Sequence, residues 1–293
     1  MTTLSKKNDF AVILIVNHAN PNGDPLTGNR PRVTYEGLGE ISDVAIKRKI
    51  RNRLMQMGKK IFVQSDDNRE EGDSYRSLLA RAKAEIKVDP KKDEEYRKAA
   101  CEKWLDVRAF GQVFPIKGES KGQGASIGIR GPVSIHNAFS VTKVENRMTS
   151  IQITKSVSTA EGKEGDAGKR ASDTMGMKHR VDHGVYVFYG VMNPQLASKT
   201  GFLDEDAQAI KEALRTLFVN DASSARPEGS MAVHKVYWWE HNSQNGQYSS
   251  AKVHRLLKVK VKDGVEEPND IEEHYDIELG KLPDLKCEVL DGE

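Results

Sequence analysis

Cysteine is scarce in this chain, and long apolar runs are missing. Only Cys101 and Cys287 occur among 293 residues, which excludes a disulfide-stapled scaffold or a cysteine-based zinc site and fits a reducing cytoplasm. No apolar run approaches the ~18–20 residues that cross a bilayer, so an integral membrane protein is excluded. The apolar stretch at 10–16 is too short for a secretory signal. We therefore expect a cytoplasmic protein.

The charge of the chain is divided unevenly. The formal net charge is +2, but residues 261–293 contain three lysines against twelve acidic residues, so residues 1–260 carry a net +11. The basic excess is concentrated at 30–60 and 115–180. A basic body predicts a polyanion as partner. Three interpretations of the acidic end stay open: it covers a basic groove, it pairs with a neighbouring copy, or it is mobile and solvated.

Hydrophobic periodicity predicts strands alternating with helices. Strands are expected at 10–16, 127–135, 185–192 and 231–240, and helices at 43–57, 73–88, 91–107 and 203–217. Without the two middle helices, the order is strand, helix, strand, strand, helix, strand. That order is the ferredoxin-like arrangement of an α+β fold.

Two insertions interrupt this order. A helical block at 58–107 follows the first helix, and a second insertion at 141–180 separates the second and third strands. The middle of the second insertion is rich in Ser, Gly and Lys and poor in apolar residues, so it is expected to be mobile on its own. Residues 241–293 follow the last strand as an acidic C-terminal extension.

The first helix carries two rows of cations beside its apolar stripe. Lys47 and Arg51 form one row, and Lys49 and Arg53 form the other, each pair one helical turn apart. Like charges at this spacing repel each other by roughly 0.2–0.5 kcal/mol, so two such rows favour an anion as counter-partner. Arg53 lies nearest the apolar stripe, and a structural role is expected for it.

A turn-rich loop at 18–32 precedes this helix. Its Asn, Gly and Pro residues permit tight turns and positive φ. Exposed backbone N–H groups beside Arg30 and Arg32 are able to cradle a phosphate. The succession of strand, glycine-rich loop and basic helix therefore favours binding to a phosphate backbone.

Six motifs along the chain resemble one family in their order and spacing. They are NPNGDP at 20–25, SDVAIKRKIR at 42–51, DVRAFG at 106–111, IRGPV at 129–133, TMGMKHRVDHGVY at 174–186 and SSARPEGSM at 223–231. The family is the type I-C CRISPR Cascade backbone subunit, of the repeat-associated (RAMP) superfamily, whose members line a CRISPR RNA. The likeness covers about residues 10–240, and the acidic extension matches nothing in it.

The resemblance implies a fold and a function. An RRM-like palm is expected at 10–57 and 108–240, with 58–107 as a helical finger and 141–180 as a thumb hairpin that crosses the guide. Several copies are expected to stack along one CRISPR RNA, beside other Cascade subunits, and to present it to target DNA in antiviral defence. The family's members do not cleave in this system, so no catalytic residue, metal or cofactor is expected.

The resemblance and the charge pattern together assign residues to RNA contact. The candidates are Asn20, Asn22, Gly23 and Arg30 in the loop, Lys47 and Arg51 on the helix, Arg108 and Arg130 beside the glycine-rich stretch, and Arg147, Lys178 and Arg180 in the thumb. Guide and target pair with each other, so the protein needs contacts to backbone and shape rather than to bases.

The histidines offer a different chemistry. His179 and His183 flank Asp182, but in a strand i and i+4 lie too far apart to share a metal ion, so no metal site is expected. His18 is the candidate general base of the alternative function, a metal-independent endoribonuclease that processes CRISPR RNA. No orienting partner for His18 is evident from the sequence. A structural protein that self-associates without RNA is a third hypothesis.

Acidic and aromatic residues receive structural interpretations. Asp24 is expected to close a turn, and Asp106 to pair with a nearby arginine. Tyr186 and Phe188 share one face of a strand, where packing in the core is favoured over base stacking. Trp238 and Trp239 point to opposite faces of the last strand, so one is expected in the core and the other at an interface.

Overall fold

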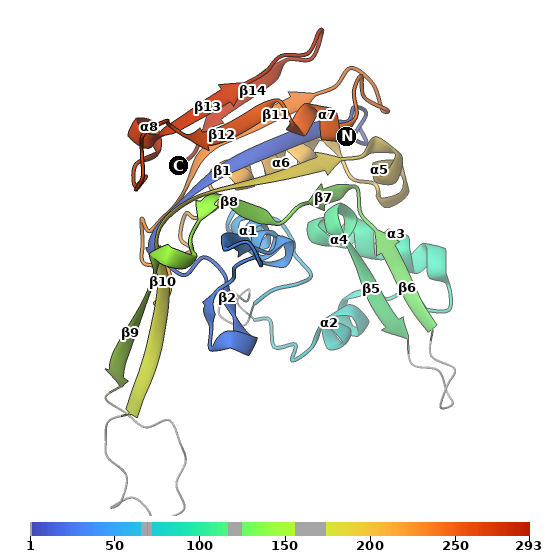
Figure 1. Ribbon diagram of the computed structural model, residues 1–293. Coiled ribbons are helices and arrows are strands. Elements are labelled where there is room, and N and C mark those ends of the chain that lie inside the picture. The colour runs from blue at the N-terminus through green and yellow to red at the C-terminus, as the bar shows by residue number, and fades with distance from the viewer. Residues whose placement is uncertain (1, 66–68, 70–71, 117–124, 156–173) are drawn as a thin grey trace, which may run out of the picture.

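The fold is a mixed α+β arrangement built on one large antiparallel sheet (Figure 1). The computed structural model describes residues 2–65, 69, 72–116, 125–155 and 174–293. The sheet runs in the order β14 (Cys287–Asp291), β11 (Met231–Glu240), β1 (Asn8–Ala19), β10 (Thr174–Met192), β8 (Ala138–Lys143) and β4 (Leu38–Ile41), and β7 (Val133–Ile135) and β9 (Met148–Lys155) also pair with β10.

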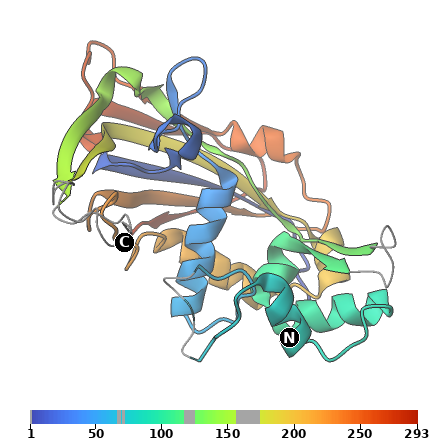
Figure 2. The same cartoon turned by 90° about the horizontal axis from the view of Figure 1, so that it is seen from below.

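Two amphipathic helices cover one face of this sheet. They are α1 (Asp43–Gln56) and α6 (Asp204–Arg215), which confirm the helices expected at 43–57 and 203–217. The Ser42 side chain caps α1 by accepting a hydrogen bond from the backbone N–H of Ala45. Ile50 and Leu214 pack with Phe10 of β1 in one core between helices and sheet. Figure 2 shows α1 lying across this face of the sheet.

The aromatic residues of the sheet are buried. Tyr186 and Phe188 belong to the core beneath the helices and are fully covered, so the expectation of packing rather than base stacking is confirmed. Trp238 lies in that same core, while Trp239 lies in a second core on the other face. The expectation that one of the two tryptophans lies at an exposed interface is wrong for the folded chain, since both are at most 2% exposed.

The acidic C-terminal extension covers the second face of the sheet. It forms α7 (Ser250–His254), β12 (Leu257–Val261), α8 (Ile271–His274) and β13 (Tyr275–Leu279), and ends in β14 beside β11. Val253 and Leu257 pack there against Ile13 and Trp239. The interpretation of this segment as a mobile, solvated end is therefore wrong. Its charges face solvent, while its alternating apolar residues complete a core.

A buried charge cluster fastens the start of the extension to β1. The carboxylate of Asp9 is fully buried and lies 3.1 Å from Lys7 Nζ, 2.8 Å from His241 Nε2 and 3.3 Å from His254 Nε2. Burial opposes its ionisation, but hydrogen bonds from the two histidines lower the pKa of Asp9 well below its ordinary value. Because the donors come from Lys7 just before β1, from the residue after β11 and from α7, the buried carboxylate holds these segments together.

A satellite of helices with one hairpin forms its own small core. It consists of α2 (Leu78–Glu85), α3 (Asp93–Lys103), α4 (Leu105–Phe110), β5 (Gly111–Ile116) and β6 (Ala125–Arg130). Phe62 and Trp104 are the largest side chains of this core that are less than 2% exposed. The single helix expected at 91–107 is two helices that meet at Trp104, and the helix expected at 73–88 begins only after its Ser77 cap.

The single strand expected at 127–135 is wrong. The segment divides into β6, which pairs with β5, and β7, which pairs with β10 in the large sheet. Pro132 lies between them and has no backbone N–H to donate to a ladder, so it is a natural point of division.

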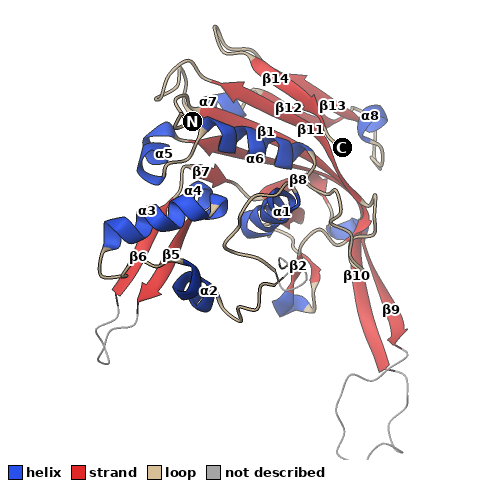
Figure 3. Ribbon diagram, turned by 180° about the vertical axis from the view of Figure 1, so that it is seen from behind, coloured by secondary structure: helices blue, strands red, loops and turns tan. Residues whose placement is uncertain are grey.

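Three projections extend from the side of the sheet that carries α1. They are the hairpin of β5 and β6, the hairpin of β9 and β10, and a loop with β2 (Gly23–Asp24), the short helix η1 (Pro25–Thr27) and β3 (Arg30–Pro31). Figure 3 shows the same arrangement from behind, with α5 (Pro194–Thr200) beside α3. The mobility expected in the middle of 141–180 concerns residues 156–173, which lie outside the described residues. Among the described residues, no helix is both long and apolar enough to cross a membrane.

Candidate nucleic-acid interface

One flank of α1 carries Lys47 and Arg51 above an aromatic ring. Lys47 Nζ lies 5.9 Å and the Arg51 guanidinium 5.1 Å from the centre of the Phe110 ring. Lys47 also forms an ion pair of 3.0 Å with Asp43, one turn earlier on the same helix. Its side chain remains about one-fifth exposed (22%), so an incoming phosphate can exchange with Asp43 at little cost.

Arg51 is held inside the protein. Its Nε donates to Asp106 Oδ2 at 2.9 Å, and the Asp106 side chain is only 1% exposed. The same carboxylate accepts the backbone N–H groups of Phe62 at 2.7 Å and Val63 at 3.1 Å. The expected pairing of Asp106 with an arginine is thus confirmed. The counter-anion of Arg51 belongs to the fold, which leaves the predicted phosphate contact of Arg51 without geometric support.

The second cationic row of α1 also points inward. Lys49 is buried and forms an ion pair with Asp221, and Arg53 Nε donates to the Thr216 hydroxyl at 2.7 Å. The structural role expected for Arg53 is confirmed. Both residues connect α1 to the segment at the end of α6. Most of the cations in the two rows of α1 therefore have partners within this chain.

Asn20, Asn22 and Gly23 shape the loop that leads to α1. The Asn22 Oδ1 accepts both the backbone N–H and the hydroxyl of Ser42 at 2.9 Å each, and Asn20 Nδ2 donates to the carbonyl of Asn29 at 2.7 Å. A Cβ at Gly23 would lie 2.0 Å from Asn29 Oδ1, so a larger residue there would displace the Asn29 side chain. Asn20 and Asn22 thus brace the loop by hydrogen bonds, and Gly23 leaves room for the Asn29 side chain. Asp24 caps η1, as expected of a turn residue.

The tip of this loop presents cationic and apolar side chains to solvent. Arg30 is exposed, and Arg32 lies 3.5 Å from Asp24. Leu26 and Tyr35 are 94% and 106% exposed. Exposed aromatic and apolar side chains beside a cation are typical of binding surfaces.

Arg108 and Arg130 have different environments. Arg108 makes two hydrogen bonds of 2.7 Å each to the two carboxylate oxygens of Asp206, which is 3% exposed, and so joins α4 to α6. Its charge is used within the fold, and its predicted contact with RNA lacks geometric support. Arg130 ends β6 and is exposed to solvent.

The candidates in the β9–β10 hairpin divide in the same way. Arg147 donates to the backbone carbonyl of Pro268 in the extension. Arg180 Nε donates to Asp182 Oδ1 at 2.9 Å and remains 37% exposed. Lys178 is exposed. Arg180 and Lys178 are therefore accessible, whereas Arg147 braces the hairpin against the extension.

The structure supplies the orienting partner of His18 that the sequence lacked. His18 Nδ1 lies 3.3 Å from Asp182 Oδ1, and the His18 side chain is 66% exposed. Burial opposes the ionisation of Asp182, but hydrogen bonds from Thr149, Arg180 and His18 lower the pKa of this carboxyl. His18 has a φ of 52°, in the left-handed region that non-glycine residues seldom adopt.

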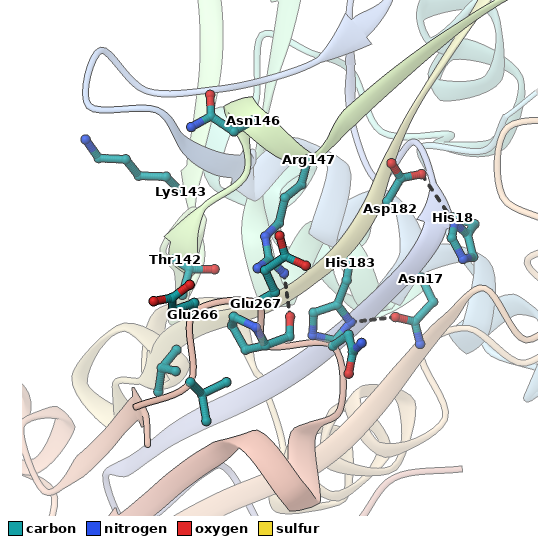
Figure 4. Close-up of a pocket in the computed structure, with 14 residues that line it drawn as sticks. Asn17, His18, Thr142, Lys143, Asn146, Arg147, Asp182, His183, Glu266 and Glu267 are labelled. Carbon is teal, nitrogen blue, oxygen red and sulfur yellow. Dashed lines mark hydrogen bonds and ion pairs between the residues drawn. The ribbon is translucent and has the colours of Figure 1, made fainter. Parts of the chain in front are cut away.

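His183 lines a pocket together with His18 and Asp182, and sequence reasoning missed this pocket (Figure 4). The pocket of about 1040 Å³ lies between the base of the β9–β10 hairpin and the 261–269 segment of the extension. Burial and the nearby Arg147 charge lower the pKa of His183 to about 4. The only signal in the sequence was the cluster of histidines, because the opposing wall lies some 80 positions further along the chain.

Metal chemistry finds no support in the side chains. His179 Nδ1 lies 2.8 Å from the Ser150 hydroxyl across the hairpin. Within the described ranges, no group of three or more His, Cys, Asp or Glu side chains is placed to hold a metal ion.

Comparisons with known proteins identify one matching family and several similar chains. A family model described as CRISPR-associated protein Cas7 matches residues 6–280. A Haloferax volcanii protein described as CRISPR-associated protein Cas7 is 27% identical over an alignment of 225 residues, which covers 72% of this chain and 63% of that relative. The chain thus spans less than two thirds of the length of that relative. A chain of a solved "CRISPR RNA-guided surveillance complex, pre-nicking" aligns with a TM-score of 0.43 at 18% identity and covers 80% of this chain and 78% of its own. A chain of a Type III-B Cmr-beta complex bound to cognate target RNA aligns with a TM-score of 0.39 at 11% identity, covering 79% and 60%.

Proposed function

Because this chain belongs to the CRISPR-associated protein Cas7 family, we propose that it is a CRISPR RNA-binding backbone subunit of a type I-C effector complex. In this proposal several copies track along one guide, contact its sugar-phosphate chain without cleaving it, and present it for pairing with target DNA beside the other Cascade subunits. Backbone contacts and shape suffice for this task, because base pairing reads the sequence.

One observation carries the proposal. Each of the three projections on the α1 side has an exposed cation: Arg30 on the loop, Arg130 on the β5–β6 hairpin and Lys178 on the β9–β10 hairpin. The helix that carries Lys47, α1, lies between the β9–β10 and β5–β6 hairpins (Figure 1). The opposite face of the sheet is covered by the acidic extension, which repels a phosphate chain. Charge thus favours RNA on the α1 side.

The division of the chain follows from this proposal. The strand order β11-β1-β10-β8, with α1 and α6 on one face, supports a ferredoxin-like, RRM-like palm at 10–57 and 108–240. Residues 58–107 then form the finger, 141–180 the thumb and 241–293 the extension that covers the palm.

Replacement of the three projecting cations tests the proposal. The variant Arg30→Ala, Arg130→Ala, Lys178→Ala is expected to bind single-stranded RNA on the order of 50-fold more weakly at 0.15 M salt, because each lost phosphate contact removes ~0.7 from the slope of log affinity against log salt. Fluorescence anisotropy of labelled RNA at several salt concentrations measures both the affinity and the slope.

A matched control removes three exposed lysines of the extension, Lys258, Lys260 and Lys286. This control is expected to retain wild-type affinity and slope. Equal losses in both triple variants would mean that only total charge matters, and an unaffected first variant would place the RNA elsewhere.

The pair of His18 and Asp182 favours a second candidate, the endoribonuclease. An exposed imidazole oriented by a carboxylate, with Arg180 2.9 Å from that carboxylate, is able to move a proton in RNA cleavage. The proposed scaffold is expected to leave repeat RNA intact over hours of incubation. Specific cleavage that disappears in His18→Ala, but persists in His179→Ala on the β9–β10 hairpin, would favour the enzyme instead.

A further inference from the structure

One side of the strand β13 is unpaired. On its other side β13 pairs with β12, and this two-stranded sheet lies over the second face of the large sheet (Figure 1). A hydrogen bond from the backbone N–H of Lys262 to the carbonyl of His274 fixes which residues of β13 point toward β12. In an antiparallel pair, every second residue directs both of its backbone groups to the partner strand. The backbone N–H and C=O groups of Ile277 and Leu279 therefore point away from β12.

These backbone groups open onto an apolar groove. Within the described part of the chain, no hydrogen bond occupies the outward N–H and C=O groups of Ile277 and Leu279. Both side chains are half-buried, and they line a groove of about 400 Å³ together with Tyr237 of β11 and Val289 of β14. Val289 is 45% exposed, so the apolar surface of the groove is only partly covered.

The open edge of β13 lacks the features that usually protect an edge strand. Natural edge strands commonly carry lysine or proline, or are interrupted by a bulge. The sequence of β13 is Tyr-Asp-Ile-Glu-Leu, without lysine or proline, and its register with β12 is regular. An unprotected edge beside an apolar groove suits strand addition, in which main-chain hydrogen bonds give affinity and alternate side chains give specificity.

The outer face of this two-stranded sheet indicates the charge of the added strand. On β12 the outward residues are Lys258 and Lys260, which are exposed. They lie opposite the acidic residues Glu278 and Asp276 of β13. A further strand beside β13 would place its own outward side chains against these two carboxylates, and opposite charges across strands are favourable. The β13 strand of a second copy would bring acidic residues against acidic ones, so a basic strand is favoured instead.

We propose that the open edge of β13 binds an extended segment of a partner protein as a third strand, in which apolar residues facing Val289 alternate with outward lysines or arginines. The strand β12, Leu-Lys-Val-Lys-Val, has this alternation and occupies the other side of β13. The site lies on the face of the sheet opposite α1. It therefore leaves the proposed RNA side free and does not depend on RNA binding.

A peptide with the sequence of residues 255–262, Arg-Leu-Leu-Lys-Val-Lys-Val-Lys, tests the site on the full-length chain. Fluorescence anisotropy of the labelled peptide measures its affinity. The matched control is the same peptide with glutamate at its three lysine positions, and it is expected to bind about tenfold more weakly because like charges then oppose each other. Hydrogen exchange of the segment 275–280 is expected to slow when the basic peptide binds, since the outward N–H groups become hydrogen-bonded.

Two variants of Ile277 separate the backbone contact from side-chain packing. Ile277→Pro removes the outward N–H, which takes no part in the ladder with β12, and proline is tolerated at such an edge position. Ile277→Ala keeps this N–H and loses most of the same side chain. Ile277→Pro is expected to bind the basic peptide about tenfold more weakly than Ile277→Ala. Thermal melting shows whether both variants are folded.

A charge variant tests the same site without altering the backbone. The Glu278 side chain is 54% exposed and forms only a surface ion pair with Lys260, so Glu278→Lys is expected to fold normally. Its preference for the basic peptide over the acidic peptide is expected to fall to about twofold or less.

Equal binding of the basic peptide by folded Ile277→Pro and Ile277→Ala would overturn the inference, because the peptide would then lie elsewhere or replace β12. Equal binding of both peptides by the wild type, or no binding at about 1 mM peptide, would overturn it as well. RNA affinity is expected to be the same in both Ile277 variants as in the wild type, so failure at this edge leaves the proposed function intact.

Discussion

Arg51→Ala is expected to lower the free energy of unfolding by about 3–5 kcal/mol, or Tm by about 10 °C. The reason is the Asp106 carboxylate, which is 1% exposed and accepts Arg51 Nε at 2.9 Å. Removal of the guanidinium leaves the Asp106 carboxylate buried with only two backbone N–H donors. Removing one partner of a buried ion pair destabilises a protein more than the intact pair stabilises it, because the remaining charge is left uncompensated. Urea denaturation followed by circular dichroism measures the loss.

Lys47→Ala is the matched control for Arg51→Ala. It removes the same charge one turn earlier, but its 3.0 Å partner Asp43 lies on the same helix and both side chains are partly exposed. Pairs of this kind contribute roughly 0.3–0.5 kcal/mol, so Tm is expected to change by about 1 °C or less, while RNA affinity falls. If Arg51→Ala is as stable as the wild type and binds RNA poorly, Arg51 contacts phosphate as the sequence predicted.

Between pH 7 and pH 4 the free energy of unfolding of the wild type is expected to fall by about 3 kcal/mol more than that of His183→Phe. Burial and the Arg147 charge lower the pKa of folded His183 to about 4, whereas the unfolded chain titrates near the ordinary value of 6.5. Between pH 6.5 and pH 4, His183 is protonated in the unfolded state but remains neutral in the folded state, so protonation stabilises the unfolded state. The loss therefore begins near pH 6.5 and is complete near pH 4.

Urea denaturation of both proteins at half-unit pH steps separates this contribution from those of other groups. The two curves of free energy against pH are expected to run parallel above pH 6.5, with a constant offset for the lost hydrogen bond to Asn17. Curves that stay parallel down to pH 4 would show that His183 titrates normally in the folded protein.

Local patterns in the sequence predicted the central strands and the two helices on the α1 face. The run at 10–16 and the spacing of Ile46, Ile50 and Leu54 depend on neighbours along the chain, and both elements formed as expected. Capping by Ser42 is local in the same sense. Elements of this kind can be predicted without information about the residues that pack against them.

The roles of the cations were not predictable in this way. Helical spacing shows that Arg51 is on a flank of α1, but its partner Asp106 lies 55 positions away and is brought there by the packing of α4 in the satellite core. Arg108 and Asp206 are separated by 98 positions. The sequence indicated where positive charge gathers, and only the packing determined which of these charges the fold uses itself.

Net charge alone left three interpretations of the acidic extension open, one of them a mobile, solvated end. The pattern was more informative, because Leu257, Val259 and Val261 alternate with lysines in the manner of a half-buried strand. The alternation places the three apolar residues against the second face of the sheet. The charged residues of such a strand lie on its solvent-exposed face, and the net charge gives no information about the residues on the buried face.

Photo-crosslinking of the full chain to a guide RNA that contains 4-thiouridine tests the location of the RNA most directly. Crosslinked peptides identified by mass spectrometry are expected to come from the loop at 20–41, from α1 and from the described part of the β9–β10 hairpin at 174–183. Crosslinks confined to the outer surface of β12 and β13, or the absence of any RNA-dependent crosslink, would contradict the assignment of the α1 side to RNA.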